Sequence, residues 1–184
     1  MLNKKHFFLV WMLCCVLTIL PLHLCAEEET TVERPFLHTF TATDIDGNEI
    51  DQSIFADYNL TMVNVWATYC NPCISEMPDL GKLQAAYAEH GVQIIGIVSD
   101  TLNMDGTISE DQVDLAREII QVTGAAYPHL LPSQDLINIV LWQINAVPTT
   151  FFVDNNGALV GYAYEGSRSY EAWTQIIDET IKLL

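Results

Sequence analysis

The sequence predicts an α/β domain in which helices flank a central mixed β-sheet. Two patterns and one size argument lead to this class. Short apolar runs typical of buried strands alternate along the chain with amphipathic stretches of helical period. Near the C-terminus, two such runs are joined by the hairpin signal Asp154-Asn155-Asn156-Gly157, so part of the sheet is antiparallel. With 184 residues, 50% of them apolar, the chain is large enough for one domain with its own core.

An N-terminal β-hairpin is the first element predicted. Residues 36–42 alternate enough for a strand, and Asp46-Gly47-Asn48 is a turn signal before Glu49 and Ile50. Apolar runs and helical spacing predict the elements that follow. Strands are expected over residues 60–66, 92–98, 127–131, 149–153 and 158–164, and helices over residues 71–90, 109–123, 135–144 and 169–184.

The beginning of the chain has the features of a targeting segment. Lys4 and Lys5 precede fourteen uncharged residues, 7–20, and a breaker and a small residue follow at Pro21 and Ala26. This order predicts a signal peptide over residues 1–26. The alternatives are an uncleaved membrane anchor over the same residues and, as a third, lipidation at Cys25.

Each of these alternatives places the rest of the chain outside the cytoplasm, because the basic residues stay inside. We therefore expect the protein to be secreted or anchored to the outer face of a bacterial cytoplasmic membrane. Residues 27–35 are then a linker, and residues 36–184 are the folded domain.

The charge of the chain excludes one class of partner. It has 24 acidic and 7 basic residues, a net charge of −17. Nucleic-acid binding depends on Lys and Arg side chains that displace counterions from phosphates. We therefore expect no nucleic-acid partner.

Two of the five cysteines lie in the folded domain, Cys70 and Cys73. A disulfide between them closes almost no loop, so it would add little stability and indicates chemistry instead. A structural zinc site would need four ligands, and the domain has no second cysteine pair and no suitably spaced histidines. The first cysteine falls at the predicted start of a helix, where free N–H groups and the helix dipole stabilise a thiolate. We expect a redox-active pair with no metal and no cofactor.

The residues around this pair resemble the thioredoxin superfamily. Trp66 stands four residues before Cys70, as in the lead-in of the family, and Pro78 matches the proline of its active-site helix. The segment from Ala146 to Asp154 is similar to the family's cis-proline segment, with the proline at Pro148. The resemblance covers residues 35–184 and implies a thioredoxin-like fold.

Two positions are similar to the extracytoplasmic branch of ResA- and TlpA-like oxidoreductases, which carry redoxin domains of the AhpC/TSA type. Asn64 stands where cytoplasmic thioredoxins have a buried Asp, and Glu76 stands three residues after the second cysteine, as in that branch. The alternative for Glu76 is a first-turn glutamate favoured by the helix dipole. The chain departs from the branch at Tyr69, where many relatives have Trp, and in the longer connection over residues 100–111.

The resemblance implies a role for each residue of the site. Cys70 would attack a client disulfide, Cys73 would resolve the mixed disulfide, and Glu76 would help to deprotonate Cys73. The remaining residues would shape the site or tune its potential: Trp66, Asn71, Pro72, Val147 and Pro148.

The resemblance also implies partners. These are disulfide-bearing clients, such as apocytochrome c or methionine sulfoxide reductase, and a CcdA- or DsbD-like membrane protein as electron donor. Two other functions stay open. A thiol peroxidase would need a lone peroxidatic cysteine, and a copper metallochaperone would need a wider cysteine pair with a downstream histidine.

Overall fold

A computed structural model describes residues 36–184. The predicted signal or anchor segment, residues 1–26, and the predicted linker, residues 27–35, lie outside the described residues. Within residues 36–184, no helix has both the length and the apolar character needed to cross a membrane.

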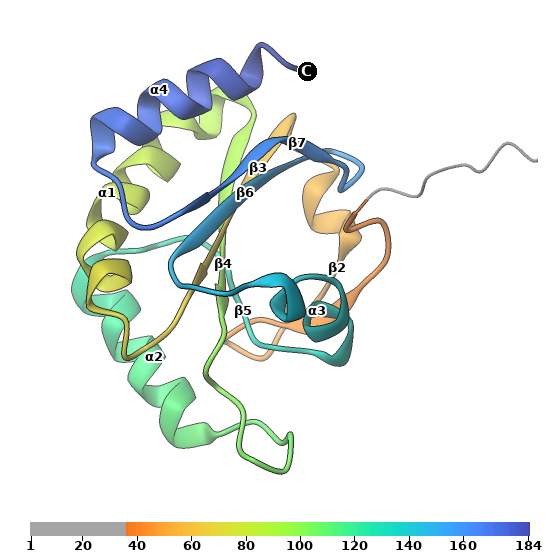
Figure 1. Cartoon of the computed structure of the whole chain (residues 1–184), viewed down its shortest axis with the longest axis vertical. Helices are drawn as coiled ribbons and strands as arrows, with labels where there is room; N and C mark the ends of the chain where they lie inside the picture. The colour runs from red at the N-terminus through yellow and green to blue at the C-terminus, as the bar shows by residue number, and fades with distance from the viewer. Residues whose placement is uncertain (1–35) are drawn as a thin grey trace, which may run out of the picture. The chain divides into compact units, whose positions relative to one another are not determined.

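A five-stranded mixed sheet forms the centre of the fold, in the order β5-β4-β3-β6-β7 (Figure 1). The central strand β3 (Leu60–Trp66) pairs in parallel with β4 (Val92–Val98) and antiparallel with β6 (Thr149–Asp154). At the two edges lie β5 (His129–Leu130), parallel to β4, and β7 (Leu159–Glu165), antiparallel to β6. Every residue of β3 and β4 is buried, because the sheet is covered on both faces.

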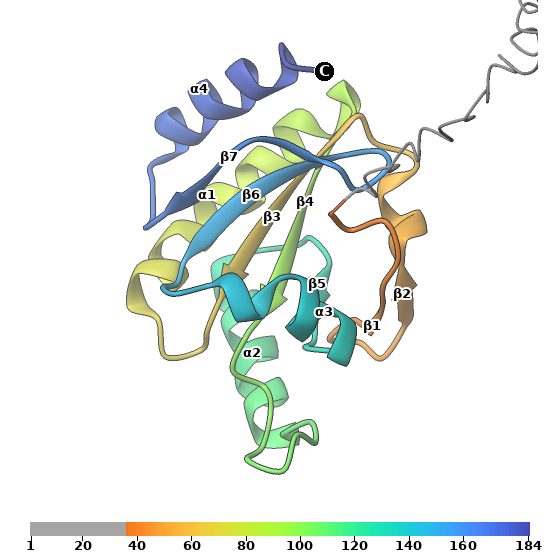
Figure 2. The ribbon, with the colours of Figure 1, turned by 45° about the vertical axis from the view of Figure 1, so that its right-hand side comes forward.

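Three long helices cover one face of the sheet. They are α1 (Asn71–Tyr87), α2 (Glu110–Thr123) and α4 (Tyr170–Ile181), and in both views they lie on the same side of the strands (Figures 1 and 2). Gly91 and Gly124 end the helical segments with positive φ, as the sequence predicts. The short 3-10 helix η2 (Ala88–His90) separates α1 from Gly91.

The opposite face is covered by shorter elements. These are α3 (Gln134–Ile139), η3 (Leu141–Gln143), η1 (Gln52–Phe55) and the N-terminal hairpin of β1 (Thr41–Thr43) and β2 (Glu49–Asp51). The α/β class, the mixed sheet and the N-terminal hairpin are therefore confirmed.

Two predicted elements differ clearly from the structure, and the strand predicted over residues 127–131 is shorter, the two residues of β5. The first strand begins at Thr41, not at residue 36, because Leu37 and Phe40 are both buried in the same core, and an extended chain would place residues three apart on opposite faces. The helix predicted over residues 135–144 is two pieces, α3 and η3. The Gln143 backbone N–H donates to the Val140 carbonyl three residues back, as in a 3-10 helix, while the Gln143 side-chain amide donates to the Ile139 carbonyl.

Candidate active site

The two domain cysteines lie where β3 passes into α1. Cys70 is the N-cap residue of α1, and its Sγ accepts a hydrogen bond from the backbone N–H of Cys73 at 3.2 Å. Pro72 lies in the first turn, where the missing N–H of proline leaves no helical bond unmade. Cys70 and Cys73 form a disulfide with an S–S distance of 2.04 Å.

The two sulfurs differ in their access to solvent. Cys73 is fully buried, whereas Cys70 retains 6% of its exposure at the start of the helix. Helix N–H groups and the dipole favour negative charge at this position. A reaction with another molecule is therefore easier at Cys70 than at Cys73.

The cis-proline segment lies against Cys70. The peptide bond between Val147 and Pro148 is cis, as the resemblance implied. The Cys70 Sγ lies 3.5 Å from the Val147 carbonyl oxygen, although the two residues are 77 positions apart. The fold thus brings together three of the predicted site residues that are far apart in the sequence, Cys70, Val147 and Pro148.

Glu76 is a buried carboxylate on α1, only 3% exposed. Its Oε1 accepts from Asn64 Nδ2 at 3.0 Å. Its Oε2 accepts from the backbone N–H of Arg168 at 3.0 Å and from Trp173 Nε1 at 3.2 Å. Burial raises the pKa of Glu76, while these three hydrogen bonds and the Arg168 charge act in the opposite direction. Glu76 is therefore a buried residue that lies beyond the first turn of α1.

A row of polar side chains crosses the sheet beneath α1. Asn64 Nδ2 also donates to Thr150 Oγ1 at 3.0 Å, and the register aligns these two residues with Gly96 and His129. Among residues 36–184, two buried side-chain atoms find no hydrogen-bond partner, Asn64 Oδ1 and the Tyr127 hydroxyl. Tyr127 interacts electrostatically with Glu76, and burial raises the pKa of Tyr127 well above its ordinary value.

Trp66 is fully buried and donates its Nε1 hydrogen to His129 Nδ1 at 3.1 Å. The other ring nitrogen of His129 lies 3.1 Å from the Ala125 carbonyl, so a neutral ring with hydrogen on Nε2 satisfies both contacts. Burial lowers the pKa of His129 to about 4, and the ring stays neutral near pH 7. Gly96 makes this pair fit, because a Cβ there would overlap His129 Nδ1.

Sequence reasoning missed four residues of this buried network: Tyr127, His129, Arg168 and Trp173. Tyr127 and Arg168 lie in connecting segments, His129 in β5 and Trp173 in α4, and they contact the site only after folding. The sequence offered one weak signal for Arg168, since it is one of four Lys or Arg residues after position 35.

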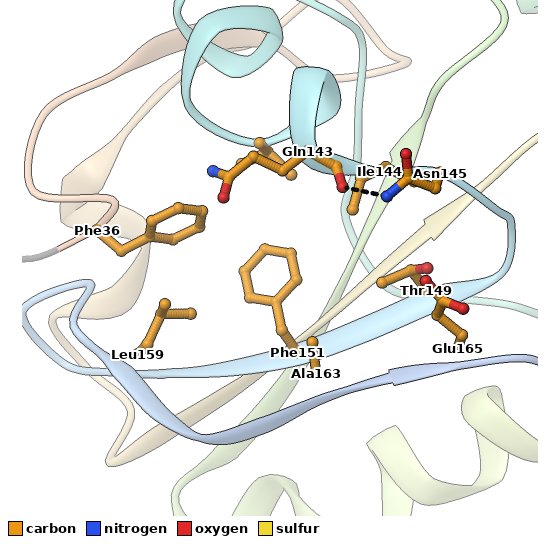
Figure 3. Close-up of a pocket in the computed structure, with 10 residues that line it drawn as sticks. Phe36, Gln143, Ile144, Asn145, Thr149, Phe151, Leu159, Ala163 and Glu165 are labelled. Atoms are coloured by element: carbon orange, nitrogen blue, oxygen red, sulfur yellow. Dashed lines mark hydrogen bonds between the residues drawn. The ribbon is translucent and has the colours of Figure 1, made fainter.

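A pocket of about 530 Å³ lies on the opposite face of the sheet (Figure 3). Phe36, Ile144 and Phe151 form apolar walls, and Thr149 and Glu165 lie at the end nearest the cis-proline segment. Neither cysteine is among the described residues that line it. The redox pair and this pocket are therefore separate features.

The chain is similar to known proteins over most of its folded part. Its sequence matches the AhpC/TSA family over residues 35–161. The thiol-disulfide oxidoreductase ResA of Bacillus thuringiensis (strain Al Hakam) is 28% identical over 122 residues, which cover 66% of this chain and 63% of that protein. ResA of Oceanobacillus iheyensis is 34% identical over 116 residues, 60% of this chain and 54% of that protein. The match thus spans less than two thirds of these relatives.

Solved structures show the fold. A thiol:disulfide interchange protein of the thioredoxin family from Chlorobium tepidum TLS superposes with a TM-score of 0.65 at 24% identity, covering 80% of this chain and 96% of that one. StoA from Bacillus subtilis gives 0.58 at 20% identity, with 76% and 96% covered. The predicted thioredoxin-like fold is confirmed.

Proposed function

The chain belongs to the AhpC/TSA family, and from this premise we propose that it is a thiol-disulfide oxidoreductase that reduces or exchanges disulfides in client proteins outside the cytoplasm. One observation carries the proposal: Cys70 stands at the start of α1 beside the cis-proline segment, with Cys73 buried behind it in the same disulfide. The similarity to proteins named thiol-disulfide oxidoreductase supports the same reaction class.

In the reductive direction, the Cys70 thiolate attacks one sulfur of a client disulfide, whose S–S bond breaks to release a client thiolate. The Cys73 thiolate then attacks the Cys70 sulfur of the mixed disulfide. This step forms the Cys70–Cys73 bond and releases the second client thiolate. Two electrons pass to the client, and its two thiolates take up two protons.

Glu76 is placed to act on the second step. Cys73 must lose its proton before it attacks, and a buried carboxylate one helical turn away with a raised pKa is a suitable acceptor. Val147 and Pro148 would shape the groove that a client backbone enters, and Trp66 would form the wall beneath the pair. Asn71 and Pro72 would tune its potential.

For location and partners, we propose export through residues 1–26, either cleaved as a signal or kept as an anchor on the outer face of the membrane. Residues 27–35 would link this segment to the folded domain. An oxidising compartment requires a steady source of electrons for reduction, which a CcdA- or DsbD-like membrane protein would supply. Apocytochrome c and methionine sulfoxide reductase are the client classes we propose.

The test is to trap the mixed disulfide. Cys73→Ser should accumulate a covalent adduct between Cys70 and a disulfide-bonded peptide, because attack survives and resolution is lost. Mass spectrometry should find the adduct, and dithiothreitol should release it. Cys70→Ser is the matched control, since its remaining cysteine is buried. Equal adduct on both variants would contradict the proposed roles.

The thiol-peroxidase alternative requires a different state of the cysteines. A peroxidase needs a lone thiolate that hydrogen peroxide oxidises to a sulfenic acid. The direct Cys70–Cys73 bond favours dithiol exchange instead. Rapid peroxide consumption by Cys73→Ser, with no peptide adduct, would favour the peroxidase.

A further inference from the structure

One loop is hydrogen-bonded both to the cis-proline segment and to Glu76. Residues 165–168 join the end of β7 to the start of α4 (Figure 2). The Gly166 N–H donates to the Pro148 carbonyl at 2.8 Å, which ties the loop to the cis-proline segment. Two residues later, the Arg168 N–H donates to Glu76 Oε2 at 3.0 Å. The backbone of this short loop therefore holds both the cis-proline segment and the buried Glu76 carboxylate.

The Arg168 side chain bonds back to this loop. Its Nη1 donates to the carbonyls of Glu165 at 3.1 Å and Gly166 at 2.6 Å. Its guanidinium carbon lies 5.1 Å from the ring centroids of both Tyr164 and Trp173. A planar guanidinium suits this arrangement, because it can donate in its plane while its faces stack on aromatic rings.

The other Lys and Arg residues among residues 36–184 make different contacts or lie at another place in the fold. Lys82 pairs with Asp79, and Arg117 pairs with Asp114 and donates to the Ile45 carbonyl. Lys182 lies at the C-terminal end of α4. Arg168 is the cation that contributes to the ionisation of Glu76.

We propose that Arg168 is a positioning residue of the redox site. Its guanidinium fixes the 165–168 loop so that the loop holds the Glu76 carboxylate and the Pro148 carbonyl at the same time. The inference rests on the proposed function only in treating Glu76 as part of the redox site. The contacts themselves exist whether or not the pair turns over.

The consequence concerns the proton on Glu76. The groups that face its carboxylate are Asn64 from β3, Trp173 from α4, Arg168 from the loop and Tyr127 from the segment before β5. All except Arg168 are neutral near pH 7. Freeing the loop removes a hydrogen bond to the charged carboxylate, so Glu76 binds its proton more tightly.

The experiment follows the Glu76 carboxyl carbon by NMR against pH in the oxidised protein, with Arg168→Met and Arg168→Lys. We expect both variants to bind the Glu76 proton at least about tenfold more tightly than wild type, the effect of losing a hydrogen bond to a charged group. Lysine keeps the charge, the smallest of the causes that lower the pKa of Glu76, but not the planar fork, so it should resemble methionine more than wild type. Lys82→Met, which removes a cation from the exposed side of α1, is the control and should leave the titration unchanged.

A second measurement tests the loop directly. The amides of Gly166 and Arg168 should exchange with solvent at least tenfold faster in Arg168→Met, while the Ala158 amide in the β6–β7 hairpin keeps its protection. A Glu76 titration that is the same in all variants, or an Arg168→Lys that matches wild type, would overturn the proposal. Both readouts use oxidised protein without a client, so they stand apart from a failed trapping experiment.

Discussion

The two faces of the central sheet differ in polarity, and two adjacent residues of β3 show the difference. Val63 lies in a row with Ile95 and Phe151 and faces the core beneath α3. Asn64, the next residue, faces α1 and Glu76. Its row across the sheet continues with polar or small residues: Thr150, Gly96 and His129.

Buried polar groups on the two faces differ in charge and in how completely they are hydrogen-bonded. On the α3 face, the buried Gln93 amide donates to Thr61 Oγ1 at 2.9 Å and to the Ile54 carbonyl at 2.7 Å, a neutral pair with partners. On the α1 face, the polar groups include a carboxylate that titrates, and among residues 36–184 both unpartnered buried atoms lie there. Among residues 36–184, buried titratable side chains, which cost stability, therefore lie on the face next to the redox pair.

The largest expected effect on stability comes from adding a side chain at Gly96 in the polar row. Gly96→Ala places a Cβ against His129 Nδ1 and 3.1 Å from Trp66 Nε1. We expect a loss of about 3 kcal/mol in unfolding free energy, from overpacking and a broken buried hydrogen bond. Urea unfolding measures it. Adding His129→Ala should recover part of the loss, and a double variant no better than the sum of the singles would contradict this cause.

The two rows can be exchanged by near-isosteric substitutions. Val63→Thr buries a hydroxyl in the apolar row and should cost about 1–3 kcal/mol. Thr150→Val removes the acceptor of Asn64 and should cost about 1 kcal/mol. Unfolding midpoints give both values. Only Thr150→Val should also alter the Glu76 titration; a change caused by Val63→Thr would show that the faces are not independent.

The carboxylate makes stability depend on pH. Because folding raises the pKa of Glu76, its folded form binds the proton more tightly than its unfolded form. Its contribution is therefore fully present below the unfolded pKa and is lost as pH rises through the folded pKa. Glu76→Gln should flatten this decline, and the Asn64 amide can rotate to offer its unpartnered Oδ1 to the new amide.

Urea unfolding at pH 4 and pH 7.5 checks this prediction. The stability of Glu76→Gln relative to wild type should rise between the two values. Glu89→Gln, an exposed substitution on η2, is the control and should show no such change. A relative stability of Glu76→Gln that is constant with pH would contradict the buried titration.

The smallest effect is expected at Tyr127. Its hydroxyl has no hydrogen-bond partner among residues 36–184, so Tyr127→Phe removes a desolvated group and loses no bond. We expect a change between zero and a gain of about 1 kcal/mol by urea unfolding. A loss greater than about 1 kcal/mol would indicate that the hydroxyl makes a stabilising contact in solution.

Much of the framework could be predicted because its signals are local. Residues 60–66 and 92–98 are strands as predicted, since a continuous apolar run suits a strand covered on both faces. Pro72 and Gly91 mark the ends of the α1 segment through their own backbone preferences. The cysteine spacing located the redox pair, because residues three apart lie on one turn of a helix.

Only the tertiary structure decided what surrounds that pair. The partners of Glu76 lie 12, 92 and 97 positions away, and His129 lies 63 positions from Trp66. No periodicity connects such residues, and their contacts depend on strand order, register and the path of one loop. By itself the sequence determined where most strands and helices and the reactive sulfurs occur, because propensity and spacing act over a few residues. Packing determined which face buries a charge and which loop holds it, because those choices require the whole sheet to be assembled.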